Sequence, residues 1–318
     1  MRYVIYGAGA VGGVIGARLH QAGLATTLVA RGDHLRALRR DGLILDGPDG
    51  VHTLPVPAVG GADEVAWTDD TVVLLCVKSQ QTAAALDDIG AHAPLGTPVV
   101  AVQNGVANER AILRRLPDVY AVCVMLPSTY LSPGVVVQGS ANAPGILDIG
   151  RFPGGIDVVA EAVSVDLRAA GFASQPRADI MAWKHRKLIM NLGNGVGAVA
   201  APSLAADELT ATARAEGEEV LAAAGLKVVS VQDDLARRSD LIARRTDIDH
   251  DGSSTWQSVQ RRTGDVEIDY LAGEIVLLGR LYGVATPANE LIQRTVHRVV
   301  REGLPPASLD AAELLVQL

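Results

Sequence analysis

Short apolar runs alternate with helically spaced apolar residues throughout the first half of the chain. Residues 71–77 form a continuous apolar run, which is typical of a strand buried on both faces of a parallel sheet. Alternation of such strands with helices predicts a doubly wound α/β domain, which the strands at 135–138 and 146–149 are expected to close. We expect strands at residues 3–6, 25–30, 43–45, 51–56, 71–77, 98–102, 121–125, 135–138 and 146–149, and helices at 11–22, 36–40, 80–89, 110–116 and 158–170.

The pattern changes after about Pro176, where strand-like runs nearly vanish. A boundary at residues 175–178 therefore separates an α/β domain, residues 1–176, from a mostly α-helical domain, residues 177–318. A chain of 318 residues is long enough for two domains of ordinary size. In the second domain we expect helices at residues 180–193, 206–224, 231–245, 267–282 and 288–301.

Composition limits the classes of partner. Lys and Arg number 28 against 36 Asp and Glu, a net charge of −8, and only 3% of residues are aromatic, so no nucleic-acid partner is expected. Arg2 is followed at once by a strand and a glycine turn, which does not fit an export signal, and no membrane partner is expected. Cys76 and Cys123 lie in apolar runs and are expected to be reduced core residues of a cytoplasmic protein.

A glycine-rich motif lies directly after the first strand and directly before the first helix. In this pattern the first glycine makes a tight turn, the second lets a pyrophosphate approach, and the third allows close helix–strand packing. The helix N-terminus then presents its N–H groups to the phosphates. A Rossmann-like dinucleotide site is therefore expected, the alternative being a glycine turn without a ligand. Its expected cofactor-binding residues are Gly7, Ala8, Gly9, Ala10, Val11 and Gly12.

The end of the second strand indicates which dinucleotide binds. Proteins that bind NAD place an acidic residue there, to accept a hydrogen bond from the ribose 2′-OH. Here the strand ends at Arg31, whose guanidinium suits a 2′-phosphate. The sequence therefore favours NADP(H), although Asp33 is near enough to contact a ribose and Arg31 could instead be a solvated charge. Lys78 and Asn104 follow two later strands, at the edge where parallel sheets bind ligands.

One helix of the second domain carries a polar stripe. At about 100° per residue, Lys187, Asn191 and Asn194 share one side of an otherwise apolar helix. Buried polar groups are costly unless they are satisfied, so the stripe is a candidate site, the alternative being hydrogen bonding between helices. Lys187 could also belong to a solvated charge run. Lys184, about 60° from Lys187 around the helix, is the alternative functional lysine, and His185 points away and is expected to be structural or exposed.

Taken in order, these motifs resemble the ketopantoate reductase (2-dehydropantoate 2-reductase) family over nearly the whole chain. The second domain contributes a K-x-x-x-N, an S-S-x-x-Q, an E-I-D and a T-P motif. Besides the glycine motif, the matching residues are Arg31, Lys78, Gln81, Gln103, Asn104, Gly105, Asn108, Trp183, Lys187, Asn191, Ser253, Ser254, Gln257, Glu267, Ile268, Asp269, Thr286 and Pro287.

The resemblance implies an NADPH-dependent reduction of a 2-oxo acid to a 2-hydroxy acid, with 2-dehydropantoate as the first candidate. It implies that Lys187 gives a proton to the ketone oxygen, that Asn104 places the lysine or the nicotinamide, and that Glu267 acts with them. Asn191, Ser254 and Glu267 would hold the substrate, and Arg31, Lys78 and Gln81 the phosphate end of the cofactor. The chemistry agrees, because an ammonium near an oxygen that gains negative charge stabilises the transition state, and a lysine with a pKa of about 10.4 starts protonated.

Departures from the family pattern cluster on the substrate side. Gly195 stands where the family usually has a second Asn, and Asn194 is a hypothetical replacement. Thr255, followed by Trp256, stands where the family has a Met after its two serines, and Ala272 stands where it has an Asn after E-I-D. One extra residue lies between Ser254 and Glu267, near Gly264. A related 2-oxo acid therefore stays open as the substrate.

Two other functions stay open as well. One is a different NADP-linked hydroxyacid dehydrogenase of two-domain architecture, and the other is a non-catalytic dinucleotide sensor. A homodimer is possible. No metal is expected, because no Cys/His cluster has zinc spacing. The acidic stretch around Asp247, Asp249, His250 and Asp251 is expected to be a solvated loop.

Overall fold

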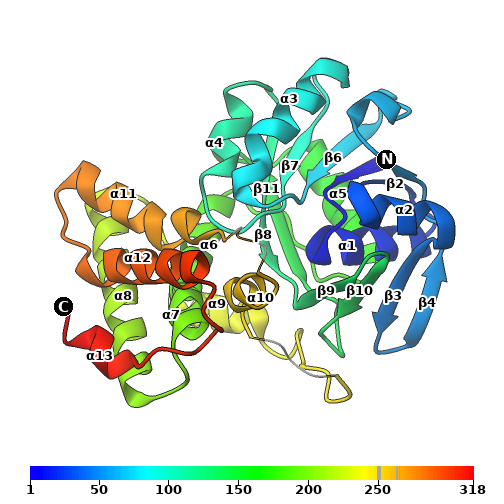
Figure 1. Cartoon of the computed structure of the whole chain (residues 1–318). Helices are drawn as coiled ribbons and strands as arrows, with labels where there is room; N and C mark the ends of the chain where they lie inside the picture. The colour runs from blue at the N-terminus through cyan, green and yellow to red at the C-terminus, as the bar shows by residue number, and fades with distance from the viewer. Residues whose placement is uncertain (249–251, 263, 265) are drawn as a thin grey trace. The chain divides into compact units, whose positions relative to one another are not determined.

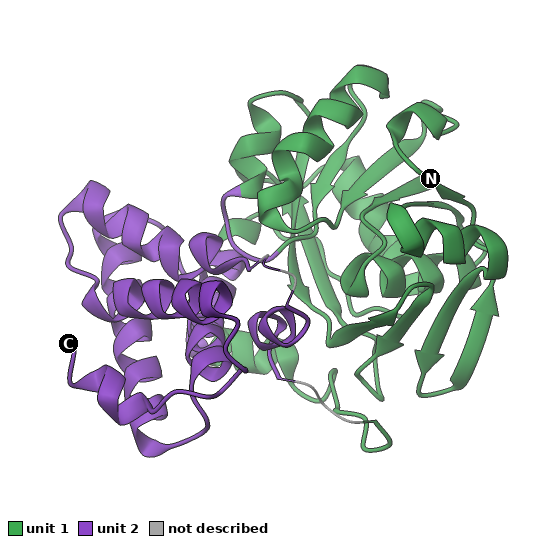
Figure 2. Ribbon diagram, viewed as in Figure 1, with its two compact units in different colours: residues 1–103, 108–181, 232–248 green, residues 104–107, 182–231, 249–318 purple. Residues whose placement is uncertain are grey.

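The computed structural model describes residues 1–248, 252–262, 264 and 266–318, and these form two units. Unit 1 comprises residues 1–103, 108–181 and 232–248, and unit 2 comprises residues 104–107, 182–231 and 249–318 (Figure 2). The short segment 104–107 thus belongs with the helical unit, and 232–248 returns to the α/β unit. The assignment of residues 1–176 to the cofactor and 177–318 to the substrate stays a prediction.

Unit 1 is built on a seven-stranded sheet (Figure 1). Its strands are parallel except β11, which pairs antiparallel with β8. The chain runs from β1 outward to β2 and β5 on one side and to β6, β7 and β8 on the other, which confirms the doubly wound prediction. In spatial order the strands are β11 (Ile146–Arg151), β8 (Val119–Met125), β7 (Val99–Ala101), β6 (Thr71–Leu75), β1 (Arg2–Tyr6), β2 (Ala25–Val29) and β5 (Ala58–Val59).

A second, four-stranded sheet corrects one expectation. The strand expected at 135–138 does not join the main sheet, because Val135–Val137 pair in parallel with one neighbour and antiparallel with another that was not predicted. The unpredicted strand, β9, is short and four of its five side chains carry a hydroxyl group, so it lacks a strong apolar pattern. This sheet has the order β4 (Gly50–Leu54), β3 (Leu43–Gly47), β10 (Val135–Gln138) and β9 (Ser128–Ser132).

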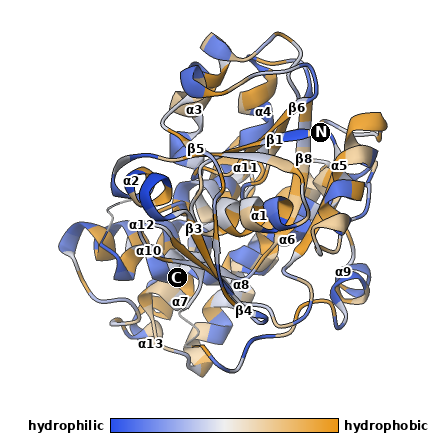
Figure 3. Ribbon diagram, turned by 90° about the vertical axis from the view of Figure 1, so that its right-hand side faces the viewer, coloured by the Kyte–Doolittle hydropathy of each residue, from blue (hydrophilic) through white to orange (hydrophobic). Residues whose placement is uncertain are grey.

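The core of unit 1 lies on both faces of the main sheet. Successive side chains of β1 alternate between two apolar clusters, with Tyr3 and Ile5 in one and Val4 and Tyr6 in the other. The first cluster takes in α1, α5 and the second sheet, and the other takes in α3 and α4. The helix α2 is mostly hydrophilic (Figure 3), although its Leu38 belongs to the first cluster. The helices are α1 (Ala10–Gln21), α2 (Gly32–Asp41), α3 (Thr82–His92), α4 (Asn108–Leu113) and α5 (Val158–Ala169), with short 3₁₀ turns η1 (Ala62–Glu64) and η2 (Ser79–Gln81).

A helix from the second half of the chain also belongs to this unit. The helix α9 (Val231–Arg238) is shorter than the expected 231–245, because Ser239 has a positive φ of 34° that ends it. Arg237 forms a two-point ion pair with the buried Asp148 of β11, at 2.7 and 2.9 Å, and Arg177 shares the same carboxylate. Arg245, 5% exposed, donates to the Asp46 side chain and to the Gln138 carbonyl oxygen.

The helical prediction for the rest of the chain holds, with three changes. The helix expected at 180–193 ends at Asn191, and a separate helix starts at Gly193 after the turn residue Leu192. The helix expected from 267 begins at Ala272. Two short helices, α10 and α13, were not expected. The elements are α6 (Ile180–Asn191), α7 (Gly193–Val199), α8 (Leu204–Ala223), α10 (Ser254–Gln260), η3 (Ile268–Tyr270), α11 (Ala272–Tyr282), α12 (Pro287–Glu302) and α13 (Ala311–Leu315). Among the described residues, no helix is both long and apolar enough to cross a membrane.

A buried carboxylate on α8 holds the start of α12. Glu216 accepts hydrogen bonds from the backbone N–H groups of Ala288 and Asn289, at 2.8 and 3.0 Å, and from the Asn289 side chain at 2.7 Å. Residues in the first turn of a helix leave N–H groups without intrahelical acceptors, and a negative charge there is favourable. Glu216 therefore satisfies the helix end that the T-P motif begins.

We expect Glu216→Ala to lower the free energy of unfolding by about 2–4 kcal/mol, because three buried donors lose their acceptor. Denaturant unfolding followed by circular dichroism measures this loss. Glu219→Ala, an exposed carboxylate on the same helix, is the matched control and should change stability by less than about 0.5 kcal/mol. Equal stability of the two variants would contradict the capping role.

Candidate nucleotide and substrate sites

The glycine motif forms a turn that only glycine fits at two of its three positions. Gly7 has a φ of +106°, and a Cβ there would lie 2.8 Å from the backbone N of Val77. A Cβ at Gly12 would lie 2.2 Å from the carbonyl oxygen of Gly7 and 2.9 Å from Ile5. At Gly9, by contrast, a Cβ would meet nothing within 4 Å. The turn is thus closed against the sheet on one side and open beside Gly9, as phosphate approach requires.

The start of α1 suits an anion. Gly9 is the N-cap residue, it supplies no side-chain cap, and the first turn holds no acidic residue. Gly13 is the first residue whose N–H reaches a helix carbonyl, that of Gly9, at 2.7 Å. The N–H groups before it have no intrahelical acceptor and carry the positive end of the helix dipole. The residues Gly7 to Gly12 therefore fit the pyrophosphate of a dinucleotide.

Arg31 lies at the expected place, at the end of β2, as the N-cap of α2. Its guanidinium donates to the Tyr6 hydroxyl over 3.4 Å, and the Tyr6 hydroxyl in turn donates to Asp88. Burial and the Asp88 carboxylate raise the pKa of Tyr6 well above its ordinary value, so the phenol stays neutral. Asp33, the competing acidic residue, forms an ion pair with Arg36. The exposed Arg31 is thus held by the Tyr6 hydroxyl, and the acidic residue nearest to it in α2 is paired with Arg36.

The turns after β6 and β7 are joined by a buried polar network that the sequence did not reveal. The Gln103 amide donates to the Val77 carbonyl oxygen and to the Thr82 hydroxyl, each at 2.8 Å. The Thr82 hydroxyl donates to Asn108, whose amide donates to Ser79. Lys78 and Gln81 lie at the two ends of the turn that this network holds, and the backbone N–H of Gln81 donates to the carbonyl of Lys78 at 2.8 Å.

In unit 2, two of the predicted site residues contact each other. The Asn191 amide on α6 donates to the side-chain oxygen of Asn104 over 3.3 Å, although 87 residues separate them. Gly105, next to Asn104, has a φ of +77°, and a Cβ there would lie 2.7 Å from the Tyr270 carbonyl. The turn at Asn104 therefore packs directly on η3, which begins immediately after Glu267. Because the Asn104 oxygen already accepts this bond, its amide nitrogen is oriented to donate elsewhere.

The charge run 184–187 is not a solvated surface. Lys184, His185 and Arg186 are 3%, 6% and 7% exposed, whereas Lys187 is half-buried. His185 binds the Lys227 carbonyl at 2.7 Å, which confirms its expected structural role. Arg186 binds the Val229 carbonyl and Glu218. Lys187 is thus the most accessible member of the run.

Asn194 and Ser254 lie on separate short helices. The helix expected over 180–193 is divided at Leu192, so Asn194 lies on α7 and not on α6, and its place beside Lys187 and Asn191 stays a prediction. Its backbone carbonyl accepts a hydrogen bond at 3.2 Å from Ser253, which also caps α10 ahead of Ser254. The packing of α10 on α7 brings these two segments together.

The position of Gly195 is filled by its neighbours. A Cβ there would lie 2.5 Å from a methyl group of Ile292 and 3.0 Å from one of Ile268, so a larger residue would not fit unless these buried side chains moved. Of the acidic stretch named above, Asp247 is described and pairs with Arg245, whereas residues 249–251 lie outside the described part, as do residues 263 and 265. Within the described part, no three His, Cys, Asp or Glu side chains form a group that could hold a metal ion. No disulfide joins Cys76 and Cys123.

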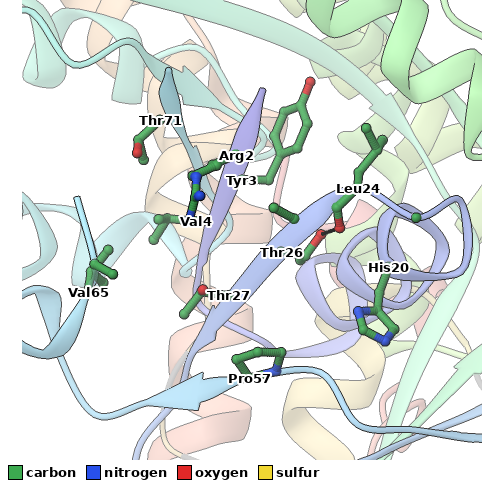
Figure 4. A pocket seen from close by; sticks show the side chains of 13 residues that line it. Arg2, Tyr3, Val4, His20, Leu24, Thr26, Thr27, Pro57, Val65 and Thr71 are labelled. Carbon is green, nitrogen blue, oxygen red and sulfur yellow. Dashed lines mark hydrogen bonds between the residues drawn. The ribbon is translucent and has the colours of Figure 1, made fainter. Parts of the chain in front are cut away.

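A hollow of about 400 Å³ lies away from these residues (Figure 4). It is lined by Arg2, Val4, Thr26, Thr27 and Thr71, at the amino ends of the parallel strands. The glycine turn follows Tyr6, at the opposite end of β1. Parallel sheets bind ligands at their carboxyl ends, so we assign this hollow no part in nucleotide binding.

A glycine turn at the switch point of a doubly wound parallel sheet, joined to a helical unit, defines the class of dinucleotide-binding α/β proteins. Within that class, the chain belongs to the ketopantoate reductase family. The family model "Ketopantoate reductase PanE/ApbA" matches residues 3–154, and its "C terminal" counterpart matches residues 179–300.

The chain is similar to several known proteins over almost its full length. The 2-dehydropantoate 2-reductase of Halobacterium salinarum is 28% identical, with 95% of this chain and all of that protein covered. A ketopantoate reductase from Ralstonia eutropha superposes with a TM-score of 0.80 at 26% identity, with 95% and 99% covered. A D-mandelate dehydrogenase solved with NADH and anilino(oxo)acetate superposes with a TM-score of 0.82 at 24% identity over the same shares, which shows a shared fold.

Proposed function

We propose that this chain reduces 2-dehydropantoate to pantoate with NADPH as the hydride source. The observation that carries the proposal is that both halves of the chain match models of one reductase family. Full-length relatives named 2-dehydropantoate 2-reductase support it. The open glycine turn, the uncapped start of α1 and Arg31 fit the phosphates of the cofactor.

We assign the following roles in this reaction to residues of the chain. When bound, NADPH supplies a hydride to the ketone carbon. Negative charge then develops on the ketone oxygen, and Lys187 holds the proton that this oxygen takes up. Asn191 orients Asn104 through the 3.3 Å hydrogen bond, which leaves the Asn104 amide N–H groups to position the reacting groups. Ser254, Glu267 and Asn194 are proposed to bind the substrate.

The exposure of Lys187 supports it over Lys184 as the proton donor. Lys184 is 3% exposed and Lys187 is half-buried, so Lys187 is the more accessible to a substrate. We expect the partners of this chain to be a small 2-oxo acid and, in a homodimer, a second copy of itself. Two cysteines outside any disulfide fit a cytoplasmic location.

A related 2-oxo acid is the second candidate substrate. Ile292 and Ile268 fill the space beside the buried Gly195, so that position cannot carry the amide that the family pattern places there. A substrate that does not need this amide, such as a 2-oxo acid with an apolar side chain, is therefore the alternative. The deciding experiment follows NADPH absorbance with 2-dehydropantoate and with 2-oxo acids that carry apolar side chains. Turnover with 2-dehydropantoate no faster than with buffer would defeat the first candidate, and no turnover with any 2-oxo acid would defeat both.

Arg31→Gln is expected to weaken NADPH binding by about 10–100-fold and NADH binding hardly at all, because the lost contact is a charge-assisted hydrogen bond to the 2′-phosphate. Fluorescence titration with both nucleotides measures the ratio. Arg40→Gln, an exposed arginine in the last turn of α2, is the matched control. If both variants keep the preference of the unmodified protein, Arg31 does not select the cofactor.

A further inference from the structure

His34, in the first turn of α2, bridges two segments that are distant in the sequence. Its Nε2 lies 2.7 Å from the carbonyl oxygen of Ala8, inside the glycine turn. Its Nδ1 lies 2.9 Å from the backbone N of Gly134, which precedes β10. The imidazole ring also packs edge-to-face against the Tyr130 ring of β9, with the ring centroids 5.0 Å apart, and this contact restricts its orientation.

These two partners determine the tautomer. The Gly134 N–H can only donate, so Nδ1 accepts and carries no proton. The Ala8 carbonyl can only accept, so the proton is on Nε2. Burial lowers the pKa of His34 below its ordinary value, although the bond to Ala8 opposes the shift. The neutral ring that the two hydrogen bonds require is therefore also the form that the surroundings favour.

The bond to Ala8 sets the direction of a peptide group in the nucleotide turn. In a trans peptide the C=O and the following N–H point in opposite directions. With the Ala8 carbonyl directed to His34, the Gly9 N–H points to the other side. The N–H groups of Gly7 and Ala8 are already engaged, since both donate to the Val29 carbonyl at 3.1 Å. The Gly9 N–H is thus the first in the turn that can face a ligand. It lies beside open space, because a Cβ on Gly9 would meet nothing within 4 Å.

We propose that His34 is a positioning residue for the nucleotide, which holds the Ala8–Gly9 peptide so that an N–H rather than a carbonyl oxygen faces the pyrophosphate. This inference rests on the proposed use of NADPH. Without the imidazole, the peptide can rotate and present its oxygen to the phosphates, where like charges repel. His34 does not touch the reacting atoms, so its loss acts on cofactor affinity and not on the chemical step.

Two substitutions separate the two hydrogen bonds. The side-chain nitrogen of Gln reaches about as far as Nε2 and can still donate to Ala8, whereas the oxygen of Asn stands near Nδ1 and can accept only from Gly134. We expect His34→Asn to raise the Kd and KM for NADPH about tenfold with kcat within about twofold, the loss of about one hydrogen bond. We expect His34→Gln to restore the Kd to within about threefold of the unmodified protein. His20→Gln, at the far end of α1, is the control and should bind normally.

Two results would overturn the inference. One is an unchanged Kd in His34→Asn, and the other is a Kd in His34→Gln that is no better than in His34→Asn. If the unmodified protein binds no NADPH, the proposed function and this inference fall together, whereas normal binding in all variants removes only the inference.

If a variant does not fold, the hydrogen-bonding arrangement of His34 can be tested in the unmodified protein by NMR. The ¹⁵N shifts of His34 at pH 7 should show a neutral ring with its proton on Nε2, and a proton on Nδ1 would contradict the arrangement.

Discussion

Lys187→Met is expected to lower kcat by about 10²–10⁴-fold while leaving the Kd for NADPH nearly unchanged. The expected size is that of a lost general acid. The nucleotide affinity should persist because the glycine turn and Arg31 belong to unit 1, and Lys187 belongs to unit 2. Steady-state kinetics with the best 2-oxo acid, together with a fluorescence titration of NADPH, separates the two quantities.

Two further substitutions make the result specific. Lys187→Arg keeps the positive charge, but a guanidinium does not release its proton in proteins. It should therefore recover substrate binding more than turnover. Lys184→Met tests the neighbouring lysine, and its melting temperature must be measured as well because that side chain is buried. Full turnover in Lys187→Met, or a larger loss in a folded Lys184→Met, would remove Lys187 as the proton donor.

Gly12→Ala is expected to destabilise the protein by about 3 kcal/mol or more, because the added methyl has no room. Its Cβ would lie 2.2 Å from the Gly7 carbonyl oxygen, a backbone atom that cannot rotate away. The contacts with Ile5 and Cys76 at 2.9 Å block the other directions. The helix α1 would have to move off β1, and overpacking of this kind is strongly destabilising. Thermal unfolding or the yield of soluble protein measures the effect.

Gly9→Ala is the matched comparison in the same motif. Nothing lies within 4 Å of the added methyl, and the φ of −70° suits alanine. The variant should fold with stability within about 1 kcal/mol of the unmodified protein, yet lose NADPH affinity, since the methyl occupies the side open to the phosphates. A stable Gly12→Ala would contradict the close packing of α1 on the sheet, and normal NADPH binding by Gly9→Ala would show that the turn does not bind the phosphates as proposed.

Most strands of the main sheet could be predicted, because burial on both faces gives strands such as β6 and β8 a nearly continuous apolar run, whereas the two-residue strand β5 was missed. Pairing between distant segments could not. The sequence of β10 reads as a strand, but its place in the second sheet depends on β3 and on β9, whose hydroxyl-rich sequence gives no signal. The turn at Leu192 is equally silent, because the residue itself keeps helical angles.

For the candidate sites, too, local features could be predicted and contacts between distant residues could not. The glycine motif is local, so its residues and their turn could be predicted from adjacent positions. His34 was missed because its partners lie 26 and 100 residues away. The network of Gln103, Thr82, Asn108 and Ser79 was missed for the same reason, although polar residues next to strand ends were a partial signal. Contacts between distant residues require the fold before they can be recognised.

The return of residues 232–248 to unit 1 has a consequence for synthesis on the ribosome. Asp148 is buried in β11, and its partner Arg237 follows 89 residues later. Until that segment emerges, the nascent first unit carries a buried carboxylate that has Arg177 but lacks its two-point partner. The α/β unit therefore completes its folding only after much of the helical unit has been made. A fragment that stops at residue 181 should accordingly be less stable than its apolar core alone would suggest.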